Sequence, residues 1–197
     1  NMGAAHTAVS YDGVVVSNCQ AGQIDIGRFS LDNVSVLSLN IGQPEDLLQS
    51  ARMYASAGVL SIETEKPHFE NERNSAFRVQ MRGGSFGYVS PSIRWWQKAG
   101  SRTSFSLNGN YMRADGNYPF TLVNGKYVTE EKRNNSAIYT YQIEPTLFHT
   151  FKDSSNLELK AYYFYSKRGL PGSVTLYNPI SDETLWDENV FIQTRYK

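Results

Sequence analysis

The chain has 197 residues, and its 19 Lys and Arg balance its 19 Asp and Glu, so the formal net charge is zero. That balance gives no basic surplus for binding nucleic acid, and the single cysteine, Cys19, excludes an internal disulfide framework and a cysteine-based zinc site. No apolar stretch approaches the roughly 20 residues of a membrane-spanning helix. Aromatic residues, 13% of the chain, are scarce before residue 67, which indicates two parts, 1–66 and 67–197.

The first part predicts a small mixed α+β unit. Residues 7–16 are apolar and β-branched, and they are interrupted by Asp12-Gly13, a turn signal that Asp12 is expected to organise. Residues 33–41 alternate as a strand with one slip in phase, and 59–66 form another strand. Residues 44–54 have helical spacing behind acidic residues that suit a first helical turn. The polar segment SNCQAGQID at 17–25 is a loop that cannot fill a core.

The second part predicts six strands. Apolar and polar residues alternate in runs near 77–82, 86–95 (with a break near Pro91), 104–111, 139–147, 157–165 and from 190 onward. Short turns at 98–102 and 152–156 contrast with long loops at 116–136 and 166–189. Such strands can cross a bilayer when tilted, and short turns at one end with long loops at the other are typical of an outer-membrane barrel.

The polar residues of these runs fit the same interpretation. An arginine facing lipid at mid-bilayer costs about 2–4 kcal/mol, so Arg78, Arg82, Glu158 and Lys160 are expected to face a water-filled or plugged interior. Trp95-Trp96 fits an aromatic band at the membrane surface. Plugged transporters have about 22 strands, so the chain is expected to be a fragment of a longer protein. A soluble β-sandwich fused to a small α+β domain remains the alternative.

The chain contains, in this order, the segments DGVVV at 12–16, VSVLSLNIGQP at 34–44, ARMYASAGVLSIETEK at 51–66, KRGLPG at 167–172 and DETLWDEN at 182–189. Their order and spacing resemble the TonB-dependent outer-membrane receptors, and the last two segments are typical of such receptors from Bacteroides-like bacteria. The chain departs from the family at Asn40-Ile41-Gly42, where the family has Leu-Arg-Gly, and at Ala57-Gly58, where it has paired glycines.

The resemblance implies a mixed α+β plug followed by antiparallel strands of a transmembrane β-barrel. It implies a transporter of a scarce large nutrient in the bacterial outer membrane, not an enzyme, with no cofactor of its own. The implied partners are outer-membrane lipid, the nutrient, a surface lipoprotein lid, and the TonB energy-transducing complex, whose contact site is expected upstream.

Within the family the plug is most similar to that of vitamin B12 receptors, which implies a cobalamin or related corrinoid ligand. Two plug loops then present the substrate-binding residues, which are Ala4, Ala5, His6, Asn18, Cys19, Gln20, Ala21 and Gln23. For Cys19 the simpler alternative to ligand contact is an incidental small residue. For His6 the simpler alternative is a structural role through a hydrogen bond. An iron-siderophore or haem receptor and a non-transporting binding or adhesion module are the remaining alternatives.

Overall fold

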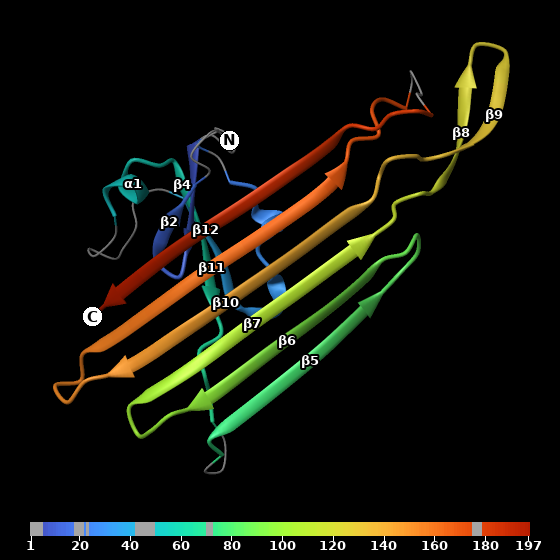
Figure 1. Ribbon diagram of the computed structural model, residues 1–197. Coiled ribbons are helices and arrows are strands. Elements are labelled where there is room, and N and C mark those ends of the chain that lie inside the picture. The colour runs from blue at the N-terminus through green and yellow to red at the C-terminus, as the bar shows by residue number, and fades with distance from the viewer. Residues whose placement is uncertain (1–5, 18–21, 23, 42–49, 70–72, 175–178) are drawn as a thin grey trace. The chain divides into compact units, whose positions relative to one another are not determined.

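The computed structural model describes residues 6–17, 22, 24–41, 50–69, 73–174 and 179–197 (Figure 1). Contacts divide the chain into two compact units, Asn1–His68 and Phe69–Lys197. Both units are built on β-sheet, and within the described ranges the only α-helix is α1, Ala51–Tyr54. The expected helix at 44–54 is therefore observed only in its last turn, because residues 42–49 lie outside the described part.

The first unit contains a four-stranded sheet with the order β2-β1-β4-β3. β1 and β4 are parallel, and the other two pairings are antiparallel. The slip in alternation along residues 33–41 corresponds to a register shift between Val34 and Val36. The elements are β1 (Thr7–Tyr11), β2 (Val14–Val16), 3₁₀-helices at Ile26–Arg28 and Leu31–Asn33, β3 (Val34–Ile41) and β4 (Gly58–Thr64).

Asp12 joins distant parts of this unit. It occupies the two-residue turn between β1 and β2, where its φ is 49° and that of Gly13 is 85°, as in a type I′ hairpin. Its buried carboxylate accepts hydrogen bonds from the backbone N of Thr64 at 2.7 Å and from Thr64 Oγ1 at 2.9 Å. Asp12 thus ties the hairpin to the end of β4, in addition to the expected role within its own turn.

The core of the first unit is small. The Tyr11 and Phe29 rings stack with centroids 4.6 Å apart, and both side chains are buried. Ala8, Met53 and Val59 form a second buried cluster. Two such clusters bury little apolar area, so hydrogen bonds such as those of Asp12 are a substantial part of the stability of this unit.

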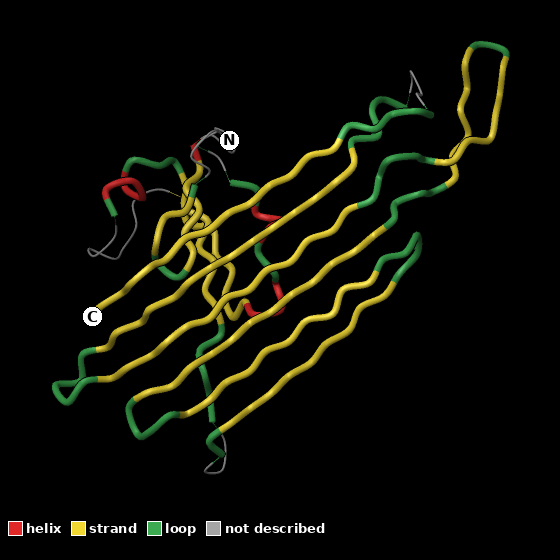
Figure 2. The backbone as a smooth tube through the Cα atoms, viewed as in Figure 1, coloured by secondary structure: helices red, strands yellow, loops and turns green. Residues whose placement is uncertain are grey.

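The second unit contains a six-stranded antiparallel sheet with the order β12-β11-β10-β7-β6-β5 (Figure 2). The sheet is open, with β5 and β12 at its edges, and a separate two-stranded hairpin is formed by β8 and β9. The strands are β5 (Ser75–Gly83), β6 (Val89–Lys98), β7 (Thr103–Ala114), β8 (Pro119–Asn124), β9 (Tyr127–Lys132), β10 (Ile138–Thr150), β11 (Asn156–Gly169) and β12 (Thr184–Tyr196).

Three features of the second unit differ from the expectation. The loop expected at 166–189 is shorter, because β11 continues to Gly169 and β12 already begins at Thr184. β6 begins at Val89 and continues through Pro91, although a break was expected there. Its pairing with β7 passes from Val89 opposite Arg113 to Ser92 opposite Asn110 without a change of register, while Pro91 remains paired with Met81 of β5. The expected long loop at 116–136 contains the β8–β9 hairpin, whose two-residue turn has Gly125 at φ 61°.

Candidate functional site

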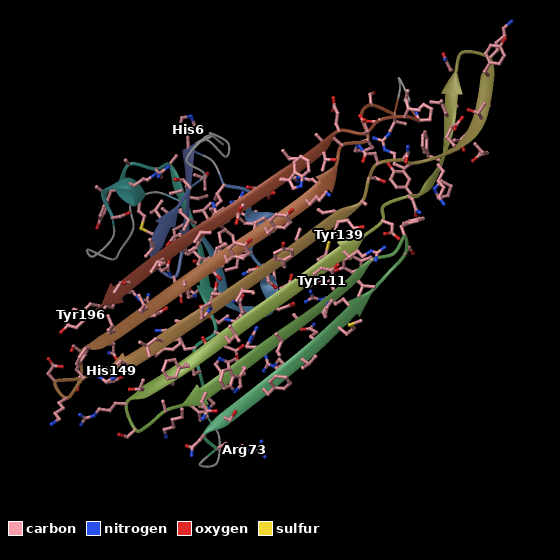
Figure 3. All side chains as sticks on the ribbon, in the orientation of Figure 1. His6, Arg73, Tyr111, Tyr139, His149 and Tyr196 are labelled. Atoms are coloured by element: carbon pink, nitrogen blue, oxygen red, sulfur yellow. The ribbon has the colours of Figure 1, made fainter. Side chains whose placement is uncertain are left out.

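One of the eight predicted ligand-binding residues lies in the described part of the chain. His6 immediately precedes β1 and is exposed, as Figure 3 shows, and its backbone carbonyl accepts a hydrogen bond from Ala57 N at 2.9 Å. Ala4, Ala5, Asn18, Cys19, Gln20, Ala21 and Gln23 lie outside the described residues. Ligand contact by the two loops therefore stays a prediction.

The feature that the structure does describe is a six-stranded sheet whose apolar side chains are exposed. Cross-strand partners such as Phe77 and Trp95, or Tyr163 and Val190, place these residues on one side, here called the apolar face. Val79 is 62% exposed and Ile192 is 72% exposed, on the two edge strands. Other exposed members are Phe77, Met81, Ile93, Trp95, Phe105, Tyr111, Tyr141, Ile143, Leu159, Val190 and Tyr196. Water would penalise each such side chain by roughly 1.5–3 kcal/mol relative to burial.

The opposite side of the sheet, here called the polar face, carries charged and hydrogen-bonding residues that are largely buried. The Lys160 side chain is 1% exposed, the Glu144 side chain is 0% exposed, and Lys160 Nζ lies 3.2 Å from Glu144 Oε1. Asn108 Nδ2 donates to the same Glu144 oxygen at 3.3 Å. Ser90, Arg94, Ser106, Thr140, Gln142, Thr146, Glu158, Ser166 and Gln193 are also buried on this face. Trp96, Tyr162 and Phe164 are buried on this face as well. The large apolar side chains of the opposite face nevertheless stay exposed, which is inverted relative to a soluble sheet that buries its apolar side.

The charged residues expected to share one side do so. Glu158 pairs with Arg195 of β12, and Lys160 lies opposite Gln193 on the same face. Arg78 lies opposite Arg94, and Arg82 opposite Ser90, also on the polar face. The two members on the edge strand β5, Arg78 and Arg82, are exposed, whereas Glu158 and Lys160 are buried.

Aromatic and basic residues gather at both ends of the apolar face. At the end with the long loops, the Arg113 guanidinium lies 5.6 Å from the Tyr139 ring centroid, and Lys167 Nζ lies 5.6 Å from the ring centroid of Trp186. Tyr111 and Tyr139 are labelled near that end in Figure 3, and His149 and Tyr196 near the other. Aromatic rings with basic neighbours at both limits of an apolar band are typical of membrane interfaces.

The two neighbouring tryptophans have different environments, because successive residues of a strand point to opposite faces. Trp95 is on the apolar face, and its Nε1 donates to Ser75 Oγ at 3.2 Å. Trp96 is buried on the polar face between two arginines, whose guanidinium carbons lie 5.7 Å (Arg78) and 5.3 Å (Arg94) from its ring centroid. The expected aromatic band therefore includes Trp95, while Trp96 is a cation–π partner.

Asn135, a residue that the sequence did not single out, connects the bases of the two long loops. It has φ 50°, and its Nδ2 donates to Glu183 O at 2.7 Å and to Leu170 O at 3.2 Å. A Cβ at Gly169 would lie 2.4 Å from Asn135 O, so only glycine allows this approach. The preceding side chains reach the same loop, since Arg133 donates to Gly172 O and Asn134 donates to Pro179 O. The one sequence signal for this site was the asparagine itself, because asparagine tolerates a positive φ better than most residues.

A metal site and a membrane-spanning helix each require a particular arrangement of residues. The described residues contain no group of three or more His, Cys, Asp or Glu side chains placed to hold a metal ion. Among the helices in the described ranges, none has the length and apolarity needed to cross a membrane. The arrangement that the structure does show is the separation of an apolar face from a polar face along six strands.

No protein-family model matches the chain, and no curated protein matches it either.

Proposed function

We propose that the chain is part of a TonB-dependent outer-membrane receptor that takes up a scarce, large nutrient. The observation that carries the proposal is the inverted sheet, with apolar residues such as Val79 and Ile192 exposed and the Glu144–Lys160 pair buried on the opposite face. In lipid this arrangement is favourable, because apolar side chains meet hydrocarbon and charged ones are kept away from it. The aromatic and basic residues at both limits of the apolar face support the same placement.

In this proposal residues 1–66 are the later part of a plug, and residues 67–197 supply the first strands of a barrel. The order of the segments DGVVV, VSVLSLNIGQP and ARMYASAGVLSIETEK supports the plug assignment. The polar face then lines the interior, and the β8–β9 hairpin with the loop joined by Asn135 lies at the outer end. A polar lining suits a moving plug, since its rearrangement exposes little apolar surface.

The proposed ligand is cobalamin or a related corrinoid, bound by the loops at 2–7 and 18–23 on the outer side of the plug. Small residues in both loops let backbone amides approach a bulky, rigid ligand. Binding alone cannot accumulate the ligand, because a ligand shifts an equilibrium only by its difference in affinity between two states. The proposal therefore requires energy delivered through TonB.

The test is equilibrium binding of cyanocobalamin to the full-length receptor, followed by uptake in cells with and without TonB. We expect saturable binding below micromolar ligand and accumulation only when TonB is present. Binding of haem or an iron-siderophore, with no cyanocobalamin binding at micromolar ligand, would contradict the corrinoid ligand but not the transport function. A full-length protein that is monodisperse in buffer without detergent would favour the non-transporting module and contradict the proposal.

A further inference from the structure

Two adjoining hollows lie on the second unit at the end with the short turns. One, of about 480 Å³, is apolar and is walled by Trp95, Phe105, Leu147 and Leu159, with Pro145 and Ala161 as smaller members. The other, of about 570 Å³, is lined by Arg102, His149, Phe151, Lys152 and Asp153. Phe105 lies opposite Leu147, and two residues further along the same strands Thr103 lies opposite His149. The hollows are therefore about 7 Å apart along the apolar face.

The second hollow contains charged groups that are not fully paired within the described part of the chain. Arg102 and Lys152 are exposed, and neither side chain has an ion-pair partner among the described residues. The Asp153 carboxylate uses one oxygen, Oδ1, to accept from Ser155 Oγ at 2.7 Å and from Ser155 N at 3.1 Å. Within the described part of the chain, Oδ2 has no hydrogen-bond donor, so it is free to accept one. The hollow thus offers two cations and one carboxylate oxygen.

The second hollow also has aromatic walls, formed by His149 and Phe151. Thr103 Oγ1 lies 2.8 Å from His149 Nδ1, which fixes the imidazole ring. The Phe151 ring packs edge-on against His149 at 4.6 Å between centroids, and Tyr196 is the next ring at 6.1 Å from Phe151. Such rings commonly occupy the level where lipid headgroups meet acyl chains.

From this arrangement we propose that the two hollows form one binding site for a zwitterionic aminophospholipid. Its phosphate lies between Arg102 and Lys152, its ammonium group donates to Asp153 Oδ2, and one acyl chain occupies the hollow beside Leu147 and Leu159. Two cations with one carboxylate match a phosphate next to a primary ammonium better than they match a purely anionic headgroup. This site rests on the proposed function, because it requires the apolar face to meet lipid.

The test is native mass spectrometry of the detergent-purified full-length receptor titrated with phosphatidylethanolamine, phosphatidylglycerol and phosphatidylcholine of identical acyl chains. We expect phosphatidylethanolamine to be retained most. The double substitution Arg102→Ala and Lys152→Ala should lower its retention about tenfold, because each cation near the surface contributes to phosphate binding. Lys98→Ala, at the end of β6 and outside both hollows, is the matched control and should leave retention unchanged.

Two further variants divide the site into its parts. Asp153→Asn should remove the preference for phosphatidylethanolamine over phosphatidylcholine, because only a primary ammonium can donate to the carboxylate. Ala161→Trp should fill the apolar hollow and lower retention of all three lipids. Equal retention by the wild type and the double variant, or stronger retention of phosphatidylglycerol by the wild type, would overturn the proposal. Either result is compatible with nutrient transport, whereas solubility without detergent would contradict the transporter itself.

Discussion

At the scale of single residues, the described structure depends on a few polar side chains that each bridge distant segments. Asp12 contacts Thr64, Asn135 contacts the loop at 170–183, and Glu144 contacts Lys160. In each case a buried or partly buried group is paired, and removing one partner would leave the other unsatisfied at a cost of about 1–3 kcal/mol. These residues are therefore the sensitive points of their units.

Asp12→Ala is expected to destabilise the first unit by about 2–3 kcal/mol. The substitution removes both hydrogen bonds to Thr64, and it places alanine at a φ of 49°, where aspartate is better tolerated. The measurement is hydrogen exchange of residues 58–64 in the full-length receptor, which should become faster. Asp12→Asn keeps an acceptor and the backbone preference, so it should have a smaller effect. Thr64→Val removes only the Oγ1 hydrogen bond and is the matched control.

The turn between β10 and β11 carries a residue-scale prediction about pH. Hydrogen bonds from the Ser155 side chain and then from its backbone N–H lower the pKa of Asp153 below its usual value. Because the folded-state pKa is lowered, the stabilisation is present above the unfolded-state pKa and is lost as the pH falls through the folded-state pKa. Ser155→Ala should raise the pKa of Asp153 toward the ordinary value, measured by the ¹³C carboxylate shift during an acid titration. An unchanged pKa would show that the side-chain hydrogen bond is not formed.

At the scale of elements, each strand of the large sheet separates its residues by face. β5 shows this directly, because Val79 on the apolar face and Gln80 on the polar face are neighbours and are both exposed. Their difference lies in which side of the sheet they occupy. A substitution that adds one charge to each therefore tests what surrounds the two faces.

Val79→Arg is expected to destabilise the protein folded in a bilayer by about 2–4 kcal/mol, because the guanidinium would face hydrocarbon. Gln80→Arg should change it by less than about 0.5 kcal/mol, as for an ordinary surface substitution. The measurement is reversible folding of the full-length receptor into phospholipid vesicles, followed by urea titration. Equal effects of the two substitutions would contradict the assignment of the faces.

At the scale of the whole molecule, the two units differ in how their apolar side chains are divided between buried and exposed positions. The first buries Tyr11 and Phe29 but exposes Leu37, Leu39 and Ile41 on β3, and the second exposes apolar residues along six strands. In the proposed outer-membrane receptor, the apolar face of the second unit meets lipid and its polar face is kept away from lipid.

A spin-label scan of β12 in the full-length receptor tests this view. Single cysteines at positions 188–193, introduced with Cys19→Ser and reconstituted in vesicles, should alternate in their exposure to oxygen. Val190→Cys and Ile192→Cys should favour oxygen, which concentrates in hydrocarbon, over a water-soluble nickel chelate. Asn189→Cys should show low exposure to oxygen. A strand without this period of two would remove the basis of the membrane assignment.

The sequence by itself determined the strands and their two faces, because a period of two is a local property that each segment carries alone. It also indicated the turn at Asp12-Gly13 and the slip in phase of β3. It missed the β8–β9 hairpin, although Asn124-Gly125 between alternating residues was a signal for one. It placed ligand contact at the loops 2–7 and 18–23, of which the structure describes His6, Thr7 and Gly22.

Only the tertiary structure decided which residues meet across the strands. The Asp12–Thr64 hydrogen bonds span 52 positions, and the joining of the long loops by Asn135 spans up to 48. Such contacts depend on strand order and register, which are set by packing and pairing between segments far apart in the chain. The same is true of the two hollows, because residues from β6, β7, β10 and β11 line the first, and His149 of β10 with residues of two different turns lines the second. The alternation of apolar and polar residues in the sequence specifies the face on which a side chain lies. The strand order and register of the folded sheet specify which other side chains it contacts there.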